Sequence, residues 1–260
     1  MRALDVLKAV DAVAAEDTRH TATLLTHFGI SKKLIAVHQH NEQQSAKVLL
    51  ERLQSGECIA LVTDAGTPAI SDPGAIVVDV LRESGVNVVP IPGPSAVITA
   101  LSASGIKSNG FLFYGFLPSS GSQRRKILEK LIVQEFTLVF YEAPHRIVEC
   151  ISDMLQIFGE SRRITIVREL TKTFETYHRS TLDEALIWLK NDSNQQRGEF
   201  VLMLEPDILQ DLPPISSEAE RTLKILLTDL PLKQAVKLTS EITSEKKNIL
   251  YEFALKYKNE

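Results

Sequence analysis

The sequence has little cysteine and no long apolar run, and each absence excludes a class of protein. Only Cys58 and Cys150 occur among 260 residues, far apart and in no C-x-x-C spacing. Such a pair argues against a disulfide framework, a zinc site and a redox pair, so we expect a cytoplasmic protein. No uninterrupted apolar stretch approaches the roughly 18 residues of a membrane span, and charges interrupt the first ten positions. We therefore expect neither a signal peptide nor a membrane partner.

Familiar catalytic and phosphate-binding motifs are also missing. No G-x-G-x-x-G follows a predicted strand, and neither G-x-x-x-x-G-K-[ST] nor G-x-S-x-G occurs. These absences argue against dinucleotide-binding, Walker-type and hydrolase enzymes. His38 and His40 fall on one face of a predicted strand, but no third ligand is suitably spaced, so we expect no metal.

No excess of positive charge is present either. The 29 basic and 33 acidic residues give a net charge of -4, so no overall field draws the chain to nucleic acid or to a membrane. A polyanion must therefore meet a local patch. Candidates are "SQRRK", with Arg124, Arg125 and Lys126, and the tail pair Lys246 and Lys247. A charge run is usually solvated surface, but the flexible, aromatic-flanked context of "SQRRK" suits phosphate contact.

Short β-rich apolar runs alternate with segments of helical period, which is typical of α/β proteins. We predict two α/β domains, at 1–107 and 108–207, with a cleft between them, then a linker at 208–217 and a small C-terminal helical module at 218–260. The strands of the first half should be mostly parallel. The predicted strands are "DAVAA", "LIAVHQH", "ECIALVTD", "VNVVPIPG", "FLFYGFLP", "FTLVFYEAP", "RRITIVREL" and "GEFVLMLEP".

Helix ends can also be predicted. Asn41 with Gln44, and Ser217 with Glu220, have the spacing of capping boxes. Apolar residues recur at helical spacing on both sides of a short "TSE" turn in the tail. These two helices form either a helix-turn-helix or a helical hairpin packed on a neighbour or on a second subunit. We favour the hairpin because the usual turn glycine is absent.

Loops rich in proline, glycine and acidic residues follow several predicted strands. They are "AAEDTRH", "TDAGTPAISDPG", "PIPGPSA", "YEAPHR" and "RELTKTFE". Ligands of open α/β sheets bind beyond the carboxyl ends of strands, where loops and helix N-termini meet. One such loop could merely shape a turn, but five at corresponding positions predict one cleft. Asp72, followed by Pro73 and Gly74, is expected to cap the next helix.

With these loops assembled, the chain resembles the bacterial ribosomal RNA small subunit methyltransferase I family, within the tetrapyrrole-methylase-like superfamily. The resemblance covers the chain from Arg2 onward. It implies two α/β domains of tetrapyrrole-methylase type and transfer of a methyl group from S-adenosylmethionine to the 2′-oxygen of a cytidine in 16S rRNA of the 30S subunit, in the decoding region. It also implies a homodimer. The motifs that carry it are "AAEDTRHT", "HNEQQ", "LVTDAGTPAISDPG", "VVPIPGPSAVITALSASG", "GFLP", "FYEAPHR", "RELTKTFET" and "LPLKQAVKLTSEI".

The resemblance and the strand ends together give candidate site residues. Cofactor contact, largely through backbone groups, is implied for Asp64, Ala65, Gly66, Ile70, Pro94, Ser95, Tyr141, Leu170 and Gly198. The candidates for the chemical step are Lys172, Glu16, Asp17, Glu142 and His145, with Lys172 expected near the 2′-oxygen. RNA contact is expected from Arg19, Arg124, Arg125, Lys126, Arg146, Lys246 and Lys247. The alternative is that Glu142 with Arg146, or Arg168 with Glu175, forms a structural ion pair.

The beginning of the chain departs from the family pattern. Family members usually start with a strand and loop of the type L-Y-I-V-P-T-P-I-G-N-L-x-D-I-T, which this chain lacks before Met1. In the superfamily fold that strand lies inside the first sheet, and its loss would expose backbone groups of its neighbours. We therefore expect the native start to lie upstream. Alternative functions are a porphyrinoid C-methyltransferase, which would not need the helical tail, and a non-catalytic nucleotide-binding or ribosome-assembly module.

Overall fold

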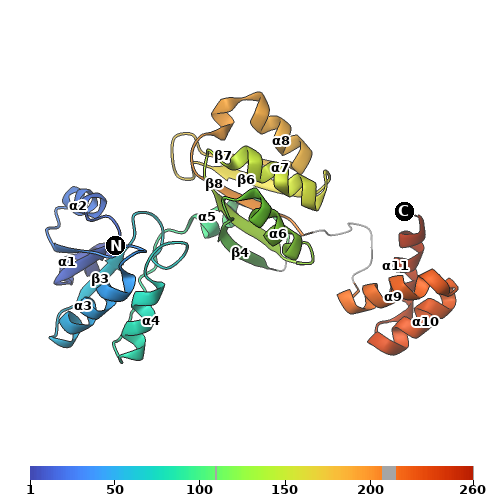
Figure 1. Cartoon of the computed structure of the whole chain (residues 1–260), viewed down its shortest axis with the longest axis horizontal. Coiled ribbons are helices and arrows are strands. Elements are labelled where there is room, and N and C mark those ends of the chain that lie inside the picture. Colours follow the sequence, from blue (N-terminus) through green and yellow to red (C-terminus); the bar gives the residue numbers. More distant parts are fainter. Residues whose placement is uncertain (109, 207–214, 260) are drawn as a thin grey trace. The chain divides into compact units, whose positions relative to one another are not determined.

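The structure is a computed structural model, and it describes residues 1–108, 110–206 and 215–259. The chain divides into two compact units, Met1–Pro206 and Asp207–Glu260, whose elements are labelled in Figure 1. Most of the predicted linker, residues 208–214, lies outside the described residues. Within the described ranges, none of the helices has the length and apolar character to cross a membrane.

The first sheet has three strands in the order β2-β1-β3, all parallel, as predicted for the first half of the chain. Ala12 of the central strand lies opposite both Lys33 and Ile59. Side chains of β1 alternate between two small cores, with Val13 in one and Ala14 in the other. The elements of this part are α1 (Arg2–Ala9), β1 (Ala12–Ala15), α2 (Thr18–His27), β2 (Lys33–Ala36), α3 (Glu42–Gln54), β3 (Ile59–Val62) and α4 (Ala75–Glu83).

One predicted strand of the first half is wrong. The described residues 86–93, "VNVVPIPG", form no strand. Pro90, Pro92 and Pro94 stand at alternate positions. In a strand, the backbone N–H groups of alternate residues point toward the same neighbouring strand. Because proline has no N–H, this segment could not donate hydrogen bonds on that side. The segment therefore runs as a loop into α5.

The second sheet has five strands in the order β4-β5-β8-β6-β7. β4 pairs parallel with β5, whereas β8 pairs antiparallel with both β5 and β6, and β7 pairs antiparallel with β6. The sequence analysis missed β7 because it is largely polar. The strands are β4 (Phe111–Phe116), β5 (Thr137–Glu142), β6 (Arg163–Arg168), β7 (Thr176–Thr181) and β8 (Phe200–Leu204).

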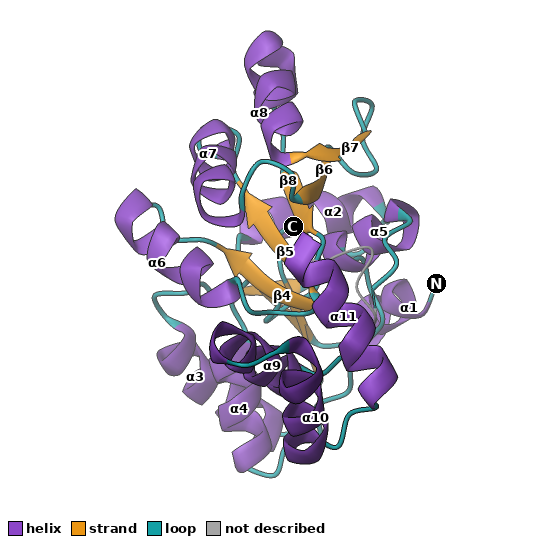
Figure 2. Cartoon of the chain, turned by 90° about the vertical axis from the view of Figure 1, so that its right-hand side faces the viewer, coloured by secondary structure: helices purple, strands orange, loops and turns teal. Residues whose placement is uncertain are grey.

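Helices cover both faces of this sheet. One face, with Phe140 and Leu202, forms the largest core with α6 (Gly121–Leu131), α7 (Ile147–Phe158) and α8 (Leu182–Asn191). On the other face, Val139, Val201 and Met203 pack against α5 (Ala96–Ser104). Figure 2 shows α6 and α7 on one side of these strands and α5 on the other. A short 3₁₀ helix, η1 (Ser193–Gln196), precedes β8. Thus α5, grouped by sequence with the first sheet, covers the second.

The start of α4 is capped by a side chain from another helix. The carboxylate of Glu42, which is buried on α3, accepts hydrogen bonds from the backbone N–H groups of Gly74 (3.0 Å) and Ile76 (3.1 Å). The prediction that Asp72 caps this helix is therefore wrong. The predicted capping box at Asn41 is also wrong, because the Asn41 amide oxygen instead accepts from His38 N, at 2.8 Å.

The described residues of the second unit form α9 (Ser217–Asp229), α10 (Leu232–Thr243) and α11 (Lys247–Asn259). Leu223, Val236, Leu250 and Phe253 are buried in a core of their own. The cap of α9 is Ser216, whose hydroxyl accepts from Ala219 N at 3.3 Å, one residue before the predicted position.

The turn between α10 and α11 has a serine where such turns usually have a glycine. Ser244 adopts the left-handed backbone conformation, with φ of 62° and ψ of 10°, that a glycine usually supplies at a helix C-terminus. A tight connection between the two helices is therefore possible in this sequence. The reason given above for favouring a simple hairpin does not hold.

We predict that Glu42→Ala lowers the free energy of unfolding by about 1–3 kcal/mol, because one buried and one partly buried backbone donor lose their acceptor. Urea unfolding followed by circular dichroism measures the change. Glu51→Ala, at an exposed position of the same helix, is the matched control and should change stability little. Equal stability of the two variants would contradict the capping role.

Candidate active site

The loop after β3, residues 63–74, is stiffened by its own backbone. Ala69 N donates to Pro73 O (3.1 Å) and Ile70 N donates to Thr67 O (3.2 Å). Ala69 and Ser71 have φ of 69° and 64°, a left-handed conformation that is costly for residues other than glycine. Such strain persists only where surrounding contacts impose it, and it often marks ligand sites.

A second loop is fastened to this one. The Thr67 hydroxyl donates to Pro94 O at 2.9 Å, which joins residues 63–74 to residues 90–96. Pro94 and Ser95, both predicted to contact a cofactor, are thereby held beside Gly66 and Ile70. The two loops form one wall, on which Asp64, Ala65 and Gly66 are exposed residues.

Carboxylates gather where β1 and β3 end. Glu16 accepts from the Thr63 hydroxyl (2.6 Å) and, more weakly, from Asp64 N (3.4 Å). The Asp64 carboxylate in turn accepts from Asp17 N at 3.1 Å. Partial burial raises the pKa of Asp72, and the negative charges of Glu16 and Asp64 raise it further. This end of the first sheet is therefore strongly negative.

The second sheet meets this wall at β4 and β5. A Cβ added at Gly115, where φ is 84°, would lie 2.8 Å from the Ser71 hydroxyl oxygen, so only glycine permits this approach. The Tyr141 ring packs edge-on against Phe113 and Phe116, with centroids 4.9 and 5.5 Å away. Burial raises the pKa of Tyr141.

The cofactor candidates from the two sheets are thus connected. Tyr141 and Leu170 pack in the same cluster as Val97, on α5 directly after Ser95 and Ala96. The negative charge of Asp72 also raises the pKa of Tyr141, which indicates that the two side chains lie near each other. Contacts therefore link four of the five segments that carry cofactor candidates, namely 64–70, 94–95, 141 and 170.

Lys172 lies in an acidic clamp. Its ammonium is 3.0 Å from Glu169 Oε1 and 3.0 Å from Glu199 Oε2, and these hydrogen bonds raise the pKa of Lys172. The group is therefore a cation at neutral pH and not a free base. Glu169 itself is held in the left-handed conformation (φ 51°), with its N–H bonded to Glu199 O at 3.0 Å.

Gly198 is required by this clamp. A Cβ added there would collide with the Glu169 side chain, and its φ of 93° also favours glycine. The antiparallel register that sets Arg168 opposite Phe200 brings residues 169–172 beside 198–199. Sequence analysis found Lys172 and Gly198 but missed Glu199, because 27 residues separate this carboxylate from the lysine and only strand pairing joins them.

Glu142 and Arg146 form the structural ion pair that was the alternative to a functional role. The Glu142 side chain is fully buried, with Oε1 3.2 Å from Arg146 Nε. Arg146 also donates to the carbonyl oxygens of Leu117 (2.6 Å) and Pro118 (3.0 Å). This corrects the assignment of Glu142 to the chemical step and of Arg146 to RNA. His145, between them, is exposed.

Arg124 is also a structural residue. Its side chain is only 3% exposed and its Nε lies 2.6 Å from Asp153 Oδ2, so it cannot contact RNA as predicted. Arg125 shares Asp153 (2.8 Å) but is 39% exposed, and Lys126 is exposed. The cause is helical phase: "SQRRK" lies in the first turns of α6, which point one of its basic residues into the core.

The remaining basic candidates lie at the surface. Arg19 is 90% exposed and pairs with Asp17 at 2.7 Å, which holds the pKa of Asp17 well below its usual range. Asp17, His20 and Asp64 bring possible metal-ligand atoms within 4.8 Å of one another. Because Arg19 already occupies Asp17, we assign no ion to this cluster. Lys246 and Lys247, at the start of α11, are exposed.

Two family profiles match the chain. One, described as tetrapyrrole (corrin/porphyrin) methylases, matches residues 1–186, and the other, described as the RsmI C-terminal HTH domain, matches residues 213–258. The second description favours a helix-turn-helix over the hairpin expected from sequence.

Named relatives match nearly the whole chain. A protein of Escherichia coli O157:H7 called ribosomal RNA small subunit methyltransferase I is 52% identical over 98% of this chain and 88% of its own length. A protein of the same name from Pseudomonas aeruginosa is 49% identical over 98% of this chain and 90% of its own.

Solved structures share the fold at low sequence identity. The methyltransferase CobJ superposes with a TM-score of 0.58 at 14% identity, covering 83% of this chain and 90% of its own. A uroporphyrin-III C-methyltransferase from Thermus thermophilus, solved with S-adenyl homocysteine, gives 0.54 at 18% identity, covering 78% and 89%. At such identities the likeness establishes the tetrapyrrole methylase fold.

We predict that Asp72→Asn stabilises the protein at neutral pH. The raised folded-state pKa of Asp72 means that its stabilising contribution is complete below the unfolded value of 3.8 and is lost as pH rises. The melting temperature of the variant, relative to wild type, should therefore increase from acidic to neutral pH. Differential scanning calorimetry tests this, with Asp79→Asn, an exposed position on α4, as the control. A difference that does not change with pH would contradict the prediction.

Proposed function

The chain belongs to the ribosomal RNA small subunit methyltransferase I family of tetrapyrrole methylases, and from this premise we propose that it methylates the 2′-oxygen of a cytidine in 16S rRNA. The methyl donor is S-adenosylmethionine, and the substrate is the 30S ribosomal subunit in the cytoplasm, at the decoding region. The observation that carries the proposal is the match to the named relatives over 98% of this chain. That match includes the C-terminal unit, which a porphyrinoid substrate would not need.

The residues of the cleft fit the methyl donor. When bound, S-adenosylmethionine supplies a methyl group already activated by a sulfonium. Its ammonium and sulfonium are positive, and the carboxylates of Glu16, Asp64 and Asp72 make the end of the first sheet negative. Its ribose hydroxyls need acceptors, and its adenine can be bonded by exposed backbone groups such as those of residues 64–66. Gly66, with φ of 84°, leaves that backbone open to a ligand.

Lys172 is the residue we assign to the chemical step. A ribose hydroxyl is a poor nucleophile until its proton leaves, and the alkoxide that develops is stabilised by a nearby cation. The clamp keeps Lys172 charged, so it acts as that cation and not as the base. Fixed electrostatic groups of this kind contribute about 10²- to 10³-fold in rate. We propose that Glu199, which is 81% exposed and 3.0 Å from the ammonium, accepts the proton.

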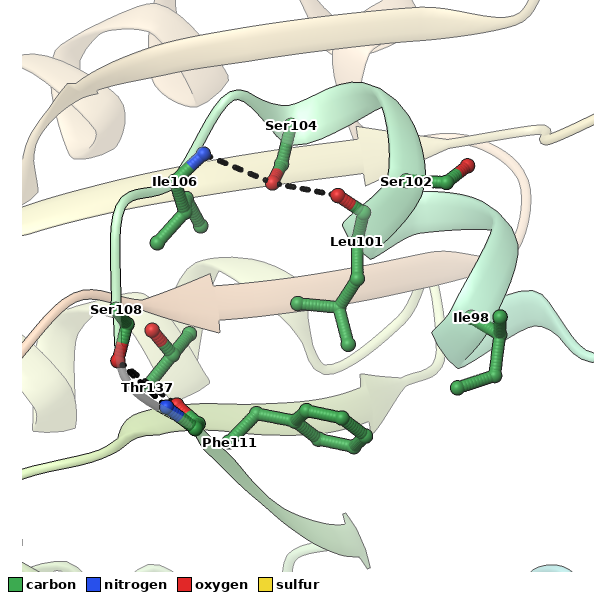
Figure 3. Close-up of a pocket in the computed structure, with 9 residues that line it drawn as sticks. Ile98, Leu101, Ser102, Ser104, Ile106, Ser108, Phe111 and Thr137 are labelled. Carbon is green, nitrogen blue, oxygen red and sulfur yellow. Dashed lines mark hydrogen bonds between the residues drawn. The ribbon is translucent and has the colours of Figure 1, made fainter.

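The protein should also form a homodimer. β4 is at one edge of the second sheet, and its residues Phe111 and Phe116 are 45% and 51% exposed. Ile98, on the adjoining α5, is 56% exposed. Leu101 and Phe111 line a hollow of about 380 Å³ between α5 and β4, which Figure 3 shows. An edge strand with exposed aromatic residues is a common interaction surface, and a second copy would cover it.

The catalytic proposal is tested with 30S subunits and donor labelled in its methyl group. Wild type should label 16S rRNA at one cytidine and protect the following phosphodiester from alkaline cleavage, because the 2′-oxygen is blocked. Lys172→Ala should reduce transfer by about 10²-fold or more and leave donor affinity, measured by calorimetry, nearly unchanged. Lys190→Ala, an exposed lysine of α8, is the matched control. Label on a base, or on a tetrapyrrole and not on RNA, would refute the function. Full activity of Lys172→Ala would refute the role of Lys172 alone.

The dimer is tested by analytical ultracentrifugation. Phe111→Glu places a charge in the apolar surface and should shift the protein from dimer to monomer. Ile187→Glu changes a side chain of α8 that is 57% exposed, outside that surface, and should leave the dimer intact. A wild-type monomer, or dissociation caused equally by both changes, would be evidence against this interface.

A further inference from the structure

The second unit has a hollow of its own between two helices. It measures about 430 Å³, a size suited to a small ligand group, and lies between the first half of α10 and the first two turns of α11. Val236, 4% exposed, lies at its base. Its lining residues are Lys233, Val236, Lys247, Asn248, Tyr251 and Glu252. We call it the α10–α11 groove.

Two lysines of the groove are uncommitted. Among the residues that the structure describes, neither Lys233 nor Lys247 makes an ion pair, and both are exposed. Two other lysines of this unit differ: Lys224 pairs with Glu220 at 2.5 Å, and Lys237 lies 3.9 Å from Glu241. The groove therefore has unneutralised positive charge beside an apolar base, while Glu252 limits that charge on one side.

The wall of the groove includes an aromatic ring and an amide. Tyr251 is half-buried, with its ring packed against the core of the unit, so its position is fixed. Asn248, one turn earlier on α11, can both donate and accept hydrogen bonds. A fixed ring between free lysines is the combination that binds an unpaired nucleotide, whose base stacks while its phosphates contact the cations.

We propose that the α10–α11 groove binds an unpaired nucleotide of RNA, with the base against Tyr251 and the flanking phosphates at Lys233 and Lys247. The proposal rests on the proposed function, which supplies RNA as the ligand. A helix-turn-helix often lays the exposed face of its second helix in the groove of a duplex. Here the free lysines flank a hollow with an apolar base, a shape that admits a single base more readily than it fits a duplex.

The test uses the full chain and two fluorescent probes, a short single-stranded RNA and a duplex of the same length, with fluorescence anisotropy as the readout. Wild type should prefer the single strand. Tyr251→Leu should weaken single-strand binding by about tenfold, and Tyr251→Phe should restore it because the ring is kept. Lys233→Ala and Lys247→Ala should each lower the slope of log affinity against log salt by roughly 0.7. Lys237→Ala, on the same helix but outside the groove, is the matched control.

Thermal melting of each variant shows whether the fold survives, and the exposed lysine variants keep the test valid if Tyr251→Leu does not fold. The proposal would be refuted if both lysine variants bound the single strand with unchanged affinity and salt slope. It would also be refuted if wild type bound the duplex as tightly as the single strand. Methyl transfer by wild type to 30S subunits is measured in the same preparation. If transfer fails while the groove variants lose RNA binding, the groove stands and the proposed function falls. If transfer succeeds while these variants bind RNA normally, only the groove falls.

Discussion

The antiparallel pairing of β8 with β5 and β6 is the constraint on which the arrangement of the site depends. Its register sets Arg168 opposite Phe200, so the turn after β6 lies beside the turn before β8 and Glu199 reaches Lys172. On one face of β8, Val201 and Met203 pack against α5. α5 directly follows the 90–96 loop, and the Thr67 hydroxyl bonds that loop to residues 63–74. The packing of α5 on β8 therefore also brings these two loops near Tyr141. One strand thus positions Glu199 beside Lys172 and also receives α5, which follows the 90–96 loop.

Carboxylates dominate both places in the first unit where candidate site residues meet. Carboxylates of Glu16, Asp64 and Asp72 gather at the end of the first sheet, where a cationic donor would be favoured. Lys172, beyond the end of β6, keeps its positive charge because two carboxylates hold it. The two carboxylates outnumber that single cation, so a polyanion would have to meet exposed basic residues elsewhere, such as Lys126. Salt screens the field of the net charge of -4 beyond about 10 Å, so such local contacts decide binding.

Much of the fold was predictable because short apolar runs form strands whatever their partners. The parallel first sheet, β4, β5, β6 and β8 followed from such runs. The predictions that were wrong or incomplete concerned features that the sequence of a single segment does not determine. The prolines at 90, 92 and 94 removed a strand, and β7 was missed because its edge position allows polar residues. Arg124 was misplaced because a charge run does not show its phase on a helix. Strand pairing brought Glu199 to Lys172, and helix packing brought Glu42 to α4, across distances in sequence that no local pattern spans.

The loop of residues 63–74 is held by hydrogen bonds of its own backbone and by contacts with other parts of the chain. Ala69 and Ser71 hold left-handed conformations, which cost on the order of 1–3 kcal/mol each and would relax in an isolated segment. Ser71 is pressed against Gly115 of the second sheet, Thr67 is bonded to Pro94, and the chain leaving the loop is fixed by Glu42. The strain is therefore sustained by both sheets together. A loop fixed in this way meets its ligand with backbone groups already in place, so little conformational entropy is lost on binding. The two prolines and two glycines of the loop serve this rigidity, and Asp72 adds charge to the wall instead of capping a helix.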